Sequence, residues 1–85
     1  MTSRKPTSTA RLFDTFKAIC EATYGVNALS ADPIVVEWTF GRMVEAHGVG
    51  AARTALGAIN DRRERLGRSP VYPHGYRPPQ PAVAS

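Results

Sequence analysis

The chain has 85 residues, a formal net charge of +4 and a sequence pI near 9.8. This length allows one small domain, whose thin core often needs a partner for stability. The single cysteine excludes an internal disulfide and argues against a cysteine-based zinc site. No apolar run reaches the roughly 20 residues of a membrane span. The polar stretch before Ala10 is unlike a signal peptide, so we expect a cytoplasmic protein that does not enter a membrane.

Helix signals predict an all-α fold, a compact domain of three helices over residues 9–67. Residues 1–8 are polar without periodicity and are predicted to be a flexible leader. The first helix is expected at 9–24, with Thr9 as its N-cap and Gly25 as its left-handed stop. Its apolar face follows helical spacing and comprises Leu12, Phe13, Phe16, Ile19, Cys20, Thr23 and Tyr24.

A second helix is predicted at 33–47, because Asp32–Pro33 is a strong start signal and Gly48 a stop signal. Ile34 and Trp38 lie roughly opposite the apolar stripe that should face the core, which is Val36, Phe40, Met43, Val44 and His47. A helix that is apolar on two sides is either buried between its neighbours or exposes a patch. Ile34 and Trp38 are therefore either further core or the anchor of a protein partner or homodimer.

The third helix is predicted at 51–66, with Gly67 as its stop. Its expected buried face is small and consists of Ala52, Ala55, Leu56, Ile59 and Leu66. Arg53, Gly57 and Asn60 are expected on its polar side.

Residues 68–85 hold most of the prolines and are predicted to be a disordered or extended tail, in which Tyr72 and Tyr76 either fold back or stack on a partner. The P-x-x-P spacing at 78–81 resembles a polyproline ligand, although this short spacing is common by chance.

Positive charge is concentrated toward the end of the chain and is carried there by arginine. Charges before Arg53 balance, so the excess follows it, and arginine suits phosphate recognition. Two helices with a short glycine link also resemble a helix-turn-helix in outline. We therefore expect a small regulatory or accessory protein that binds nucleic acid through Arg53, Arg62, Arg63, Arg65 and Arg68. The alternative is that these cations only complement a helix C-terminus.

The sequence offers little for catalysis, and we expect neither an enzyme nor a cofactor, a metal site or a small-molecule substrate. Cys20 lies on a buried face, and Cys20, His47 and His74 lack metal-ligand spacing. The acidic residues are dispersed without a pair suited to acid–base work. The competing hypothesis to nucleic-acid binding is an interaction module or small inhibitor that acts through Ile34 and Trp38.

Overall fold

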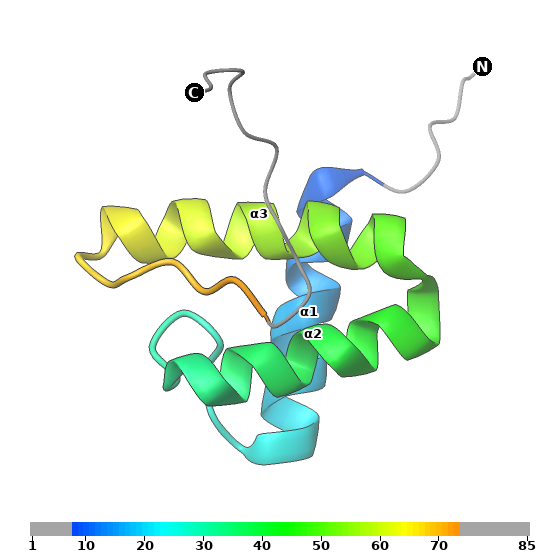
Figure 1. Cartoon of the computed structure of the whole chain (residues 1–85), viewed down its shortest axis with the longest axis horizontal. Helices are drawn as coiled ribbons and strands as arrows, with labels where there is room; N and C mark the ends of the chain where they lie inside the picture. Colours follow the sequence, from blue (N-terminus) through cyan, green and yellow to red (C-terminus); the bar gives the residue numbers. More distant parts are fainter. Residues whose placement is uncertain (1–7, 74–85) are drawn as a thin grey trace, which may run out of the picture.

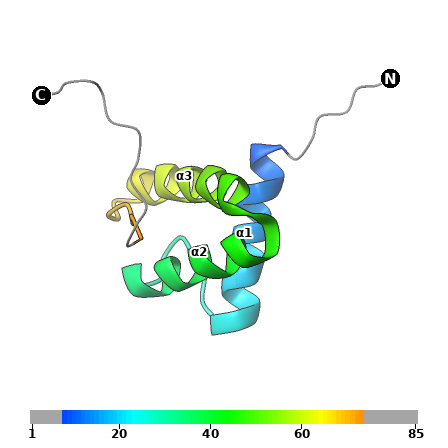
Figure 2. The same cartoon turned by 45° about the vertical axis from the view of Figure 1, so that its right-hand side comes forward.

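The computed structural model describes residues 8–73 and contains helices α1 (Thr9–Tyr24), α2 (Pro33–His47) and α3 (Val49–Arg65). In Figure 1, α2 and α3 lie side by side and run in opposite directions, and α1 crosses behind both of them. The turned view in Figure 2 shows the same arrangement, in which each helix packs against the other two. The predicted all-α, three-helix fold is therefore confirmed.

Local signals place the helix ends close to their predicted positions. The N-cap of α1 is Ser8 rather than the predicted Thr9, since the Ser8 hydroxyl accepts a hydrogen bond from the Arg11 amide at 3.2 Å. Gly25 follows α1 in the left-handed conformation, with φ of 75°. α3 begins at Val49, earlier than predicted, so that Gly48 alone links it to α2.

The core lies where the three helices meet. Leu66, a predicted core residue, is instead 57% exposed, because α3 ends at Arg65 and the chain turns away at Gly67. His47 and Thr23 are also exposed, although both were predicted on apolar faces. The largest fully buried side chains are Phe16, Met43, Leu56, Ile59, Val36, Thr39 and Cys20.

Arg63 is buried in this core, with only 2% of its surface exposed. Its Nη1 donates to the carbonyl oxygens of Ala28 and Ala31, each at 2.9 Å, and its Nε donates to the Ser69 carbonyl at 3.0 Å. Burial, with a smaller effect from the positive charge of Arg68, lowers the pKa of Arg63. A guanidinium remains protonated in proteins even so, and these bonds satisfy a charge that would be costly if left unpaired.

Asn60 holds the segment that follows α3 against the domain. Its side-chain amide donates to the Val71 carbonyl at 3.0 Å, and its amide oxygen accepts from the Val71 N–H at 2.9 Å. Val71 and Pro73 are both buried. In Figure 1 this segment, in orange, returns beneath α3 toward α2.

These contacts correct the start of the predicted disordered tail, because Val71 and Pro73, which follow residue 67, pack against the domain. Most of the predicted leader, together with Tyr76, His74 and the P-x-x-P spacing, lies outside the described residues.

Replacing Asn60 with alanine should lower the free energy of unfolding by about 1–3 kcal/mol, because it leaves the buried Val71 amide and carbonyl without their partners. Urea denaturation followed by circular dichroism measures the change. Thr54→Ala is the matched control, since Thr54 is an exposed residue of the same helix. Equal stability of Asn60→Ala and the control would contradict the role given to this amide.

Arg63→Leu should destabilise the domain by at least about 3 kcal/mol, because three carbonyl groups lose a charged donor. Arg63→Lys should recover only part of this loss, since an ammonium lacks the planar fork that reaches all three. Arg65→Leu is the control and removes only the exposed 3.3 Å pair with Asp61, worth at most about 1 kcal/mol. Thermal and urea unfolding compare the variants, and an Arg63→Leu protein as stable as Arg65→Leu would refute this account.

Candidate interaction surfaces

The outer face of α2 exposes two large apolar side chains. Ile34 is 47% exposed and Trp38 is 50% exposed, although both belong to a helix whose other side is buried. They are four residues apart and therefore occupy the same side of the helix. Of the two alternatives for these residues, the structure excludes complete burial in the core. We call Ile34, Trp38 and the exposed Gly41 on the following turn the α2 outer face.

Trp38 is supported by α1 although it is half exposed. Its ring centroid lies 5.6 Å from that of Tyr24, with the planes tilted by 42°. The Tyr24 hydroxyl in turn accepts a hydrogen bond from Arg42 Nε at 3.2 Å. The sequence pattern places Tyr24 only on the apolar face of its helix. Tyr24 is the last residue before Gly25, and a side chain at the end of a helix can reach a neighbouring helix. That position was the sequence signal for a contact between Tyr24 and another helix.

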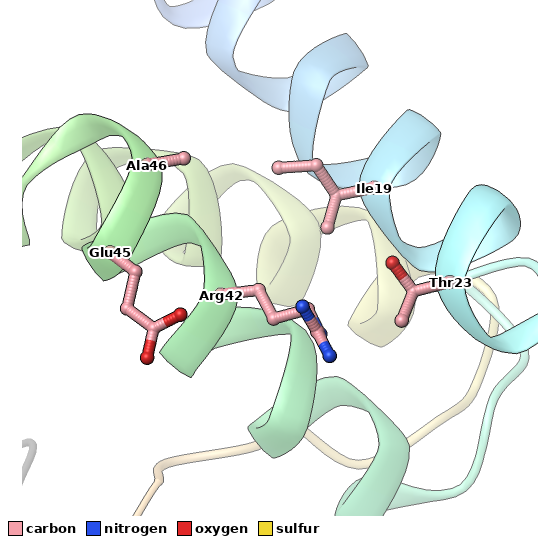
Figure 3. A pocket seen from close by; sticks show the side chains of 5 residues that line it. All are labelled: Ile19, Thr23, Arg42, Glu45 and Ala46. Atoms are coloured by element: carbon pink, nitrogen blue, oxygen red, sulfur yellow. The ribbon is translucent and has the colours of Figure 1, made fainter.

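A pocket of about 290 Å³ opens on the same seam between α1 and α2. Figure 3 shows Ile19 and Thr23 projecting from α1 toward α2, and Arg42 extending from α2 toward α1. Arg42 joins this pocket to Trp38, because it lies one turn beyond Trp38 and also contacts Tyr24. The complete lining is Ile19, Thr23, Arg42, Glu45 and Ala46. The sequence did not predict this pocket, which requires residues from two helices.

Four of the five arginines predicted to contact nucleic acid lie on the surface, and one does not. Arg53, Arg62, Arg65 and Arg68 are exposed, whereas Arg63 is interior and bound to backbone carbonyls. The assignment of Arg63 as a phosphate contact is therefore corrected: a side chain held in the core cannot reach a nucleic-acid backbone.

Arg62 and Arg65 border a second pocket, of about 300 Å³, between the start of α1 and the second half of α3. The Arg62 guanidinium lies 5.4 Å from the centroid of the Phe13 ring, and Lys17 Nζ lies 5.5 Å from it. These are cation–π distances. Arg65 also pairs with Asp61 at 3.3 Å, so the site carries both signs of charge. Its lining is Thr9, Ala10, Phe13, Ala58, Asp61, Arg62 and Arg65.

Net charge is nearly absent from the described domain. Residues 8–73 contain eight arginines and lysines against seven carboxylates, and one of those cations, Arg63, is interior. Three of the four excess positive charges of the whole chain belong to Arg4, Lys5 and Arg77, which lie outside the described residues. The link between α2 and α3 is the single residue Gly48, shorter than the turn of three to four residues typical of a helix-turn-helix.

Within residues 8–73, no His, Cys, Asp or Glu side chains gather in a group of three or more that could hold a metal ion. No helix in this range has both the length and the apolar character needed to cross a membrane. Cys20, the predicted buried thiol, is fully buried. No protein-family model, curated protein or solved structure matches this chain.

Proposed function

We propose that this chain is a protein-interaction module that binds a partner through the α2 outer face. The observation that carries this proposal is the half-exposed Trp38, held in place by Tyr24 on the neighbouring helix. Tryptophan and tyrosine are enriched among the residues that contribute most of the binding energy at protein interfaces. Residues on helices also position a contact more accurately than residues on loops.

The support of Trp38 lowers the cost of binding. A large side chain that must be ordered on association loses rotamer freedom, which opposes binding. Here Tyr24 restricts the indole before any partner arrives, and Arg42 restricts Tyr24 through its hydroxyl. Ile34 adds apolar surface one turn away from Trp38.

The charge balance of the described domain also favours a protein partner. Nucleic-acid affinity depends mainly on cations that neutralise phosphates. With Arg63 in the interior, the described surface has no excess of cations over carboxylates. Exposed apolar residues are thus a better-supported basis for binding than charge.

Trp38→Ala should reduce capture of the partner at least about tenfold, since truncating a tryptophan that anchors an interface costs about 2 kcal/mol or more. The full chain, with a photo-crosslinker at position 34, is mixed with a lysate of its native host and irradiated. Quantitative mass spectrometry then measures how much of each protein is captured. Leu66→Ala is the matched control, because Leu66 is 57% exposed but lies beyond the end of α3. Folding is checked by circular dichroism. Equal capture by folded Trp38→Ala and wild-type protein would refute the proposal.

Nucleic-acid binding is a second candidate, favoured by one observation. Arg62 and Arg65 border the pocket at the start of α1, and Lys17 lies over the same Phe13 ring as Arg62. A helix N-terminus attracts anions, so that a phosphate group could be held between it and these arginines. The exposed Arg53 and Arg68 would provide further contacts from α3 and its exit.

On this second hypothesis, Arg62→Ala should weaken binding to mixed duplex and single-stranded fragments. It should also reduce the dependence of log affinity on log salt by about one, as expected for one lost phosphate contact. Arg42→Ala removes the same charge from the α1–α2 seam and should leave both quantities unchanged. Mobility-shift titrations at about 50 mM and 200 mM salt provide the comparison. Absence of a shift at the lower salt concentration excludes this candidate.

A further inference from the structure

We infer that the protein bound by the α2 outer face is a second copy of this chain, in a symmetric dimer. Trp38 of each copy enters the pocket of the other copy that is lined by Ile19, Thr23, Arg42, Glu45 and Ala46. This inference rests on the proposed function, because it identifies the partner of the same surface.

The surface carries both an exposed indole ring and a pocket that can receive one. The half-exposed Trp38 and the pocket residues Arg42 and Glu45 all belong to α2, along the seam that α2 forms with α1. Trp38 and Arg42 are one turn apart, about 6 Å along the axis. In a two-fold contact the same patch meets itself, so residue i touches j and j touches i. Two antiparallel copies of α2 would therefore place each Trp38 opposite the other copy's pocket.

The pocket also matches an indole in its charges. Arg42 can place a guanidinium over the electron-rich face of the ring, which is a favourable cation–π arrangement. Glu45 supplies a carboxylate that can accept the indole N–H, the one polar group of tryptophan that needs a partner when buried. Ile19 provides the apolar wall. The opposite charges at the rim thus fit different parts of one incoming tryptophan.

Gly41 allows the two helices to approach. It lies on the exposed side of α2 between Trp38 and Glu45, and a Cβ built there meets nothing within 4 Å. A position without a side chain permits close contact between backbones. The small size of the domain gives a further reason for association, since a second copy adds buried apolar area that a thin core lacks.

The test measures self-association of the full chain by sedimentation velocity from about 1 μM to 1 mM. Because Trp38 is the only tryptophan, its fluorescence reports directly on its own burial. Wild-type protein should form a dimer as concentration rises, with a shift of the emission to shorter wavelengths. Trp38→Ala should raise the dissociation constant of the dimer by about 30-fold or more, and Leu66→Ala should leave it unchanged.

A second variant tests the pocket separately. Ala46→Glu keeps Trp38 but places another carboxylate beside Glu45, and it should weaken self-association as Trp38→Ala does. Adding Trp38→Ala protein, which has an intact pocket and no tryptophan, should shift the emission of Ala46→Glu protein to shorter wavelengths. Absence of this shift would contradict the seating of Trp38 in the pocket.

Failure of this inference is distinguishable from failure of the proposed function. A chain that stays monomeric throughout but captures a different protein in a Trp38-dependent manner overturns the dimer and leaves the interaction module. A dimer that persists unchanged in Trp38→Ala overturns the arrangement described here. A wild-type chain that neither self-associates nor captures any protein in a Trp38-dependent manner rejects both proposals.

Discussion

The buried guanidinium of Arg63 imposes the strongest constraint on this small domain. Its donors bind carbonyl groups from the connector between α1 and α2 and from the segment after α3. A buried charge is tolerated only when it is hydrogen-bonded, so both segments must be in place for α3 to pack with Arg63 inside. Asn60, one turn earlier, adds two hydrogen bonds to the same returning segment.

These polar contacts influence the position of α2. The connector bound by Arg63 leads directly into the start of α2 at Pro33, and the opposite end of α2 is joined to α3 through Gly48 alone. With both ends restrained, Val36 and Met43 face the core, and the side that bears Ile34 and Trp38 faces outward. The exposed apolar face is therefore a consequence of how the helix is held.

The two candidate surfaces differ in what supports them. Along the α1–α2 seam, Tyr24 and Arg42 support Trp38 beside a pocket, so that a half-exposed ring and a recess occur together. Along the α1–α3 seam, the cations Arg62 and Arg65 are partly engaged by Phe13 and Asp61. The α1–α2 seam leaves apolar surface available for a protein partner. The α1–α3 seam offers little net charge for binding phosphates. This difference underlies the preference for a protein partner.

Much of the fold could be predicted because its signals are local. Gly25, Asp32–Pro33 and Gly48 punctuate the chain through backbone preferences that act within a few residues. The periodicity of α2 likewise indicated that Ile34 and Trp38 lie opposite the core stripe. Periodicity failed at Leu66, where the helix ends and the side chain loses its neighbours.

The amino-acid sequence alone thus established three helices, their approximate ends and a second apolar face on α2. The interior position of Arg63, the clamp made by Asn60 and the pocket beside Trp38 depended on tertiary packing. Helical spacing puts position 63 four residues after Ile59, on the buried side of α3, but a charged residue there gives no local indication of burial. Arg63 is buried because it binds Ala28, at a separation of 35 residues. Whether a polar side chain is buried depends on acceptors that only the packed chain brings within reach.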